Sequence, residues 1–281
     1  MHTASDSTRI RPPAVASLFY PGSSDELRRT VRQLLRESLT EGDEPIPTEN
    51  LEAGTTLRAL IVPHAGYVYS GAVAASAYRH LQDCRDRISR VLLLGPAHRV
   101  WLQGVAAPTT EAFETPLGAI PLDTECLAEL ESTYPFVQER DDAHAEEHGL
   151  EVQLPFLQEA LSEFRLMPLV VGEVEAESLA DLLEGFREDE HTLIVISTDL
   201  SHYLPYAAAQ GRDARTAEMI ESLDPQALTA EDACGAYPLR GLLNLAAHHR
   251  WDIRRQDLRN SGDTAGGRDR VVGYGAWTLG S

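Results

Sequence analysis

The amino-acid sequence predicts an α/β fold: a single three-layer domain with helices on both faces of a central mixed sheet. Short, nearly continuous apolar runs at Leu57–Val62, Val91–Leu94 and Leu193–Ile196 are typical of strands buried on both faces. Segments with the apolar spacing of helices alternate with these runs, as in α/β proteins. No repeat, low-complexity tract or linker divides the 281 residues, so we expect one domain over 1–281, with 1–10 as a flexible arm.

The remaining elements follow in chain order. A first helix should open at Ser23, because Ser23 and Glu26 have the spacing of a capping box. Residues 40–56, rich in Glu, Pro, Gly and Thr, predict a surface loop. Further helices are expected at 71–82, 123–132, 150–162, 175–187 and 212–223, and near Pro238. Two more strands are expected at Leu166–Val171 and Val271–Leu279.

Composition excludes several classes of function. The chain has 44 acidic and 24 basic side chains, a formal net charge of −20, and every basic residue is Arg. Without Lys there can be no Schiff-base or P-loop lysine chemistry. The acidic excess also argues against binding to nucleic acid or to an anionic membrane, since both need a basic surface.

The cysteines and the beginning of the chain indicate the compartment. Cys84, Cys126 and Cys234 are an odd number without CxxC spacing, so a disulfide framework is not expected. Cys84 and Cys126 fall on predicted helices and suit packing. No signal-peptide core or membrane-spanning stretch is present, and we therefore expect a cytoplasmic protein with no membrane partner.

Polar residues with metal-binding chemistry follow the three buried strands. His64 comes just after the first strand and His98 just after the second; Asp199 and His202 follow the third. Ligands of open α/β sheets bind beyond the carboxyl ends of the strands, so these side chains should meet at one site. Two His and one carboxylate would suit a non-haem Fe(II) centre, and three His would suit zinc with a bound water. Spacing alone does not choose between them.

A second pattern lies in DDAHAEEHGLEVQLPF. His144, Glu147 and His148 match H-x-x-E-H, the signature of inverted zinc peptidases. Gly149 and Pro155 argue against the long helix that this signature needs. We favour the alternative that His148 or Glu147 lines the strand-end site as a proton carrier or as a partner of a ligand.

Cys234 has two interpretations from spacing alone. It precedes the helix expected near Pro238, and a thiol beside a helix amino terminus ionises more readily, as a metal ligand or nucleophile must. A small buried packing residue is equally compatible with its position.

Taken together, six segments resemble the MEMO family, which includes component B of the bacterial and archaeal AmmeMemoRadiSam system. They occur in the family's order: RPPAVASLFYPG (11–22), IVPHAGYVYSG (61–71), LLLGPAHR (92–99), EHGLEVQLPFLQ (147–158), STDLSHY (197–203) and ACG (233–235). The resemblance implies the single-domain α/β fold of the LigB-like class III extradiol dioxygenases. Ser17 stands where the family usually has Gly.

The resemblance also implies a specific ligand set. His64, His98 and Cys234 would hold the metal, with Asp199 and His202 beside it as an acid–base or supporting pair. The cysteine replaces the carboxylate of the dioxygenases, so ring cleavage does not follow from the fold. A thiolate suits iron, copper or zinc; the family's chemistry ranks iron slightly first and zinc third.

The expected function is that of a mononuclear redox protein acting on dioxygen or a small molecule, with Asp199, His202 and His148 as catalytic residues. The ligand is an unidentified small molecule or peptide, and the family name implies a pathway shared with a radical-SAM protein. Three alternatives stay open: an extradiol dioxygenase, a zinc-dependent hydrolase, and a non-enzymatic peptide- or protein-binding module with a structural metal.

Overall fold

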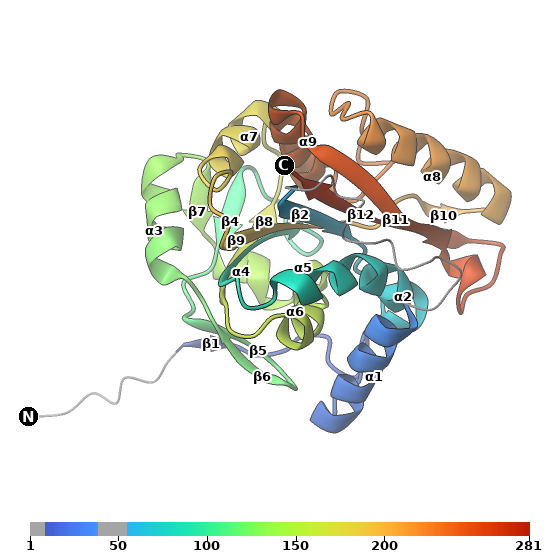
Figure 1. The fold of residues 1–281 in the computed structure, drawn as a ribbon, viewed down its shortest axis with the longest axis horizontal. Helices are drawn as coiled ribbons and strands as arrows, with labels where there is room; N and C mark the ends of the chain where they lie inside the picture. The colour runs from blue at the N-terminus through green and yellow to red at the C-terminus, as the bar shows by residue number, and fades with distance from the viewer. Residues whose placement is uncertain (1–8, 39–54) are drawn as a thin grey trace, which may run out of the picture.

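The computed structural model describes residues 9–38 and 55–281, and within them the predicted α/β fold is confirmed. A nine-stranded mixed sheet has the order β10-β12-β2-β9-β3-β8-β4-β7, with β11 paired to β12 (Figure 1). The strands are β2 (Leu57–Val62), β3 (Arg90–Pro96), β4 (Val105–Ala107), β7 (Val137–Glu139), β8 (Arg165–Val171), β9 (Thr192–Ser197), β10 (His202–Leu204), β11 (Asp252–Asn260) and β12 (Val271–Gly280).

The centre of the sheet is parallel and apolar. Strands β2, β9, β3 and β8 run in the same direction, and Ile196 of β9 lies opposite both Ile61 of β2 and Leu94 of β3. All three of these side chains are fully buried. Since all five predicted strands are present, and β2 begins and ends as expected, continuous apolar runs located the interior of this sheet correctly.

Helices cover both faces, as the three-layer prediction requires (Figure 1). One layer holds α7 (Ala176–Glu184), α8 (Tyr206–Glu221) and α9 (Ala236–His249). The other holds α1 (Ser24–Glu37), α2 (Tyr67–Tyr78) and α6 (Leu154–Ala160). At the far edge α3 (Thr124–Thr133) contacts β7 and β8.

Several boundaries differ from the sequence-based expectations. Helix α1 begins after Ser23, but the Ser23 side chain makes no capping bond, so the expected capping box does not form. The helix expected over 150–162 is broken into α5 (His148–Glu151) and α6, with Pro155 in the first turn of α6, where a missing N–H costs least. Helix α8 begins at Tyr206, six residues before the predicted start at 212.

A second, small sheet covers one end of the molecule. It consists of β1 (Ile10–Arg11), β5 (Ala112–Thr115) and β6 (Gly118–Pro121). Ile10 pairs with Ala112, so the expected arm over 1–10 is wrong at residue 10, while 1–8 lie outside the described residues. Most of the loop expected over 40–56 also lies outside them. Beyond β1, Ser17 has φ of 67°, in the left-handed region that glycine adopts most readily.

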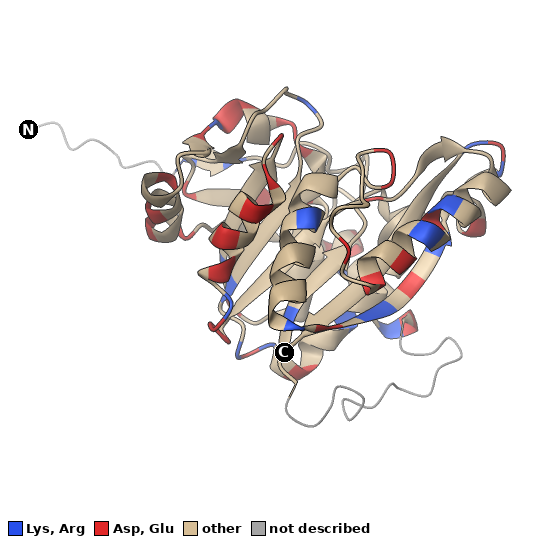
Figure 2. Cartoon of the chain, turned by 90° about the horizontal axis from the view of Figure 1, so that it is seen from above, with Lys and Arg blue, Asp and Glu red and all other residues tan. Residues whose placement is uncertain are grey.

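The acidic residues lie largely on the outer helices and loops, whereas the central strands are almost free of charge (Figure 2). This distribution fits a net charge of −20 carried mainly by hydrated surface. Among the helices described, none combines the length and apolar character needed to cross a bilayer.

Candidate metal centre

His64 lies just beyond β2 and is fixed by Asp199 and Ser197. Its backbone N–H donates to Oδ1 of Asp199 at 2.7 Å, and its Nδ1 lies 3.0 Å from Oγ of Ser197. The Ser197 hydroxyl gives its one hydrogen to the Gly149 carbonyl at 2.5 Å and accepts from Nε2 of Gln153 at 2.8 Å. Nδ1 of His64 must therefore be the donor to Ser197, which leaves a lone pair on Nε2. Burial lowers the pKa of His64 to about 3, so the ring is neutral.

His98 follows β3 and is oriented by one carboxylate. Its Nδ1 lies 2.8 Å from Oε1 of Glu147, and its backbone N–H donates to Oε2 at 2.8 Å. Burial raises the pKa of Glu147, but the hydrogen bonds from His98 and from the Gly149 amide outweigh that effect and lower it to about 2. Because a carboxylate only accepts, Nδ1 of His98 carries the hydrogen and Nε2 has the free lone pair.

Cys234 is brought to the site by the turn before α9. Its Sγ lies 3.2 Å from Nε2 of His64 and accepts the backbone N–H of Asp199 at 3.3 Å. The helix starts at Ala236, close to the predicted position. The expected ease of ionisation is wrong for the metal-free protein, because burial, assisted by the Asp199 charge, raises the pKa of Cys234 to about 12.

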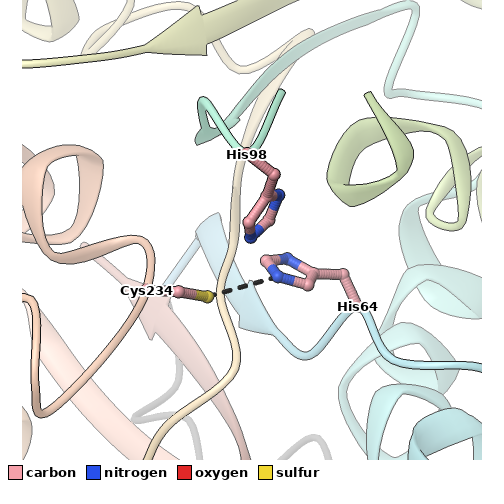
Figure 3. Close-up of side chains that lie close together, drawn as sticks. All are labelled: His64, His98 and Cys234. Atoms are coloured by element: carbon pink, nitrogen blue, oxygen red, sulfur yellow. Dashed lines mark hydrogen bonds between the residues drawn. The ribbon is translucent and has the colours of Figure 1, made fainter. Parts of the chain in front are cut away.

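The three side chains point toward one another from three separate parts of the chain (Figure 3). A ligand atom from each of His64, His98 and Cys234 lies within 4.8 Å of the others, near enough for one ion. Two imidazoles with fixed, unprotonated Nε2 atoms and one sulfur form a donor set for iron, copper or zinc. His64 is buried and His98 is exposed, so solvent reaches the centre from the His98 side.

Asp199 and His202 lie next to this group. Asp199 is 4% exposed and holds both the His64 backbone and the Cys234 sulfur, so its first effect is on the position of two ligands. Burial raises the pKa of Asp199 above its usual value. His202 opens β10 with an exposed side chain, and its Nδ1 donates to the Leu200 carbonyl at 2.8 Å, while Nε2 has no hydrogen-bond partner among the described residues.

The H-x-x-E-H pattern is divided by the structure. His144 lies in α4 (Asp141–Ala145). Its Nε2 donates to the Ala106 carbonyl at 2.9 Å, and the residue is 2% exposed. His148 lies in α5, and its ring stacks on His98 with centroids 4.5 Å apart. Since the two histidines share no helix, the inverted zinc-peptidase arrangement is absent. His98, Glu147 and His148 instead form a second cluster of possible ligands beside the first.

Sequence reasoning missed the residues that support the ligands. Ser197 and Gln153 fix the ring of His64, and Arg11 and Glu151 hold the segment around Glu147. Ser197 is the last residue of β9, so its position at a strand end was the one available indication.

This fold and this donor set define the class: an α/β protein with a candidate mononuclear metal site at the carboxyl ends of its sheet. Residues 11–278 match the model of the family described as "Memo-like protein". A MEMO1 family protein of Aquifex aeolicus is 36% identical over 95% of this chain and 97% of the relative. A MEMO1 family protein of Ignicoccus hospitalis is 35% identical with the same coverage of both chains.

The chain belongs to the Memo family. It is also similar to the crystal structure of the uncharacterized protein JW3007 from Escherichia coli K12. That likeness has a TM-score of 0.49 and 16% identity, and covers 79% of this chain and 99% of that one.

Proposed function

We propose that this protein is a mononuclear metalloprotein with redox function, in which His64, His98 and Cys234 bind iron or copper. The observation that carries the proposal is the fixed tautomer of both rings. Ser197 and Glu147 each take the Nδ1 hydrogen, so both Nε2 lone pairs are available where the Cys234 sulfur lies. A packing role for these histidines would not require such matched partners.

The neighbouring residues suit proton handling. A bound iron or copper ion would supply electron transfer to dioxygen or to a small organic substrate. His202, with Nδ1 held by Leu200, has Nε2 available to accept a proton at the exposed side of the centre. His148 is neutral because burial lowers its pKa to about 3, and it lies against His98. Asp199 keeps two ligands in position, since its carboxylate accepts the His64 backbone N–H and its own backbone N–H donates to the Cys234 sulfur.

A cavity at the same edge of the sheet suits a small-molecule or peptide ligand. It has a volume of about 890 Å³, and its lining includes Trp101 and Tyr237. These residues come three positions after His98 and Cys234, respectively. Most of its lining is polar or charged, including Arg140, Glu173 and Arg240, and the three proposed metal ligands are not part of the lining, so we propose it for a polar ligand beside the centre. As a member of the Memo family, the protein would act in a pathway shared with a radical-SAM protein.

Metal analysis tests the ligand set. The protein, purified without a histidine tag and reconstituted separately with Fe(II), Cu(I) and Zn(II), should retain a stoichiometric amount of iron or copper after desalting. His64→Ala and Cys234→Ser should lose it. Cys126→Ser is the matched control, since this thiol lies in α3, away from the site. Full metal content in both ligand variants would refute the assignment.

Turnover separates the redox proposal from the alternatives. The iron- or copper-loaded protein should consume dioxygen with ascorbate as the electron donor, and His202→Gln should slow this consumption while leaving metal content unchanged. Oxygen uptake only with diphenols would favour an extradiol dioxygenase instead. Retention of zinc alone, with amide cleavage, would favour a hydrolase, and a bound metal without any turnover would favour a binding module.

A further inference from the structure

Residues 11–22 and 147–158, two of the segments that carry the family resemblance, contact each other next to the candidate metal centre. The Arg11 guanidinium is 5% exposed and lies against the break between α4 and α5. Its Nε donates to the His144 carbonyl at 3.0 Å, and its Nη2 donates to the Glu147 carbonyl at 2.8 Å. Its Nη1 forms an ion pair with Glu151. One side chain therefore holds both sides of the break.

Glu151 makes this contact rigid. Its carboxylate is fully buried and accepts the backbone N–H groups of Ala14 at 2.7 Å and Val15 at 3.0 Å. It also accepts the Tyr20 hydroxyl at 2.5 Å. With Arg11, four donors surround this carboxylate, so the buried charge is fully compensated.

Glu147 connects the Arg11–Glu151 contact to the proposed ligand His98. Glu147 lies between two short helices, and no regular helix spans it. Arg11 holds its carbonyl, while its carboxylate holds Nδ1 and the backbone N–H of His98. A shift of the Glu147 backbone would move the carboxylate that sets the tautomer and direction of the His98 ring.

We infer that Arg11, anchored by Glu151, is a positioning residue that fixes Glu147 and thereby aims Nε2 of His98 at the metal. This inference rests on the proposed function, because it assigns a consequence to His98 being a ligand. Arg11 itself touches neither metal nor substrate.

Arg11→Lys tests the inference while keeping a cation beside Glu151. A lysine ammonium lacks the planar fork, so it cannot reach Glu151 and both carbonyls together. We expect the affinity for Co(II), measured by titration of the metal-free full chain, to fall about tenfold, at the lower end of losses from outer partners of ligands. The ligand-field bands of bound Co(II) should shift, because the direction of the His98 ring changes.

Arg90→Lys is the matched control. Arg90 pairs with Asp189 and donates to Oγ1 of Thr192 at 3.1 Å, but it begins β3, whereas His98 follows the other end of that strand. It should leave Co(II) affinity and spectrum unchanged. An equal loss in Arg90→Lys would mean that general destabilisation is responsible and would overturn the inference.

A double-mutant cycle with Glu147→Gln tests the route. If Arg11 acts through Glu147, the double variant should bind Co(II) no more weakly than Glu147→Gln alone, whereas fully additive losses would overturn the inference. If Arg11→Lys fails to fold, Tyr20→Phe, which removes one donor to Glu151, should weaken binding about threefold, and unchanged affinity would count against it.

Failure of the proposed metal site and failure of the Arg11 inference would give different results. Absence of Co(II) binding by the unmodified protein, or full binding by His64→Ala, would refute the proposed metal site. Normal binding by the unmodified protein, loss in His64→Ala, and wild-type affinity and spectrum in Arg11→Lys would refute only the positioning by Arg11.

Discussion

His144 offers a quantitative test of the difference between a buried structural histidine and a metal ligand. Its Nε2–H donates to the Ala106 carbonyl, and its Nδ1 has no hydrogen-bond partner among the described residues. Burial lowers the pKa of His144 from 6.5 to about 4. The unfolded chain therefore binds a proton at this residue in a pH range where the native protein does not. Stability from neutral His144 is complete above pH 6.5 and is lost as the pH falls toward 4.

The expected size follows from these two pKa values. At pH 5.5 about ten-elevenths of the unfolded chains carry the proton while the native ring stays neutral, a cost of about 1.4 kcal/mol relative to pH 7.5. His144→Leu removes this dependence together with one hydrogen bond, whose contribution does not vary with pH. Unfolding by urea at pH 7.5 and 5.5 measures the difference, and both values stay above the sequence pI of about 4.8.

An exposed histidine provides the control for His144. His248→Leu, which removes an exposed histidine from α9, is the matched control, and it should leave in place the pH dependence that arises at His144. Equal pH slopes for the unmodified protein and His144→Leu would show that the buried-neutral account of His144 is wrong. Loss of metal from His144→Leu would mean that His144 is a ligand, which would contradict the structural role that its contacts in α4 indicate.

Three further predictions concern the fold and the site. Gly172→Ala should destabilise by about 2 kcal/mol or more, since its Cβ would lie 2.0 Å from a backbone oxygen; Gly267→Ala, with nothing within 4 Å, should change stability by less than about 0.5 kcal/mol. Both are read from urea midpoints. Saturating metal at about 100 times Kd should stabilise the unmodified protein by about 2.7 kcal/mol and leave Cys234→Ser unchanged in thermal unfolding. Glu147→Gln should weaken metal binding by about 10–100-fold in competition with a chelator.

The sequence located the parts of the site that follow from strand geometry. His64, His98 and Asp199 were expected together because each follows a strand with a continuous apolar run, and parallel strands end at one edge. Strand β11 could not be predicted in this way, because it has no continuous apolar run. It is half-exposed and rich in Arg and Asp, so no apolar run marks it, and only its pairing with β12 defines it.

The supporting contacts could not be predicted from spacing. Cys234 lies 170 residues from His64, and no local pattern gives the packing of α9 that joins them. Arg11 and Glu151 are separated by 140 residues and pair through a carboxylate that also accepts three other donors. Such pairs depend on tertiary packing, whereas sequence periodicity reports only local structure.

The strand order has a consequence for how the centre forms. Strands β2, β9 and β3 are neighbours in the sheet, but β9 comes about a hundred residues later in the chain than β3, and Cys234 comes later still. Closing such long loops is slow and requires most of the native topology. Unlike a zinc finger, whose ligands lie close together in the chain and whose metal drives folding, this protein must complete its sheet before three donors exist to capture an ion. Metal loading should therefore be a late step in folding, with a rate limited by assembly of the sheet.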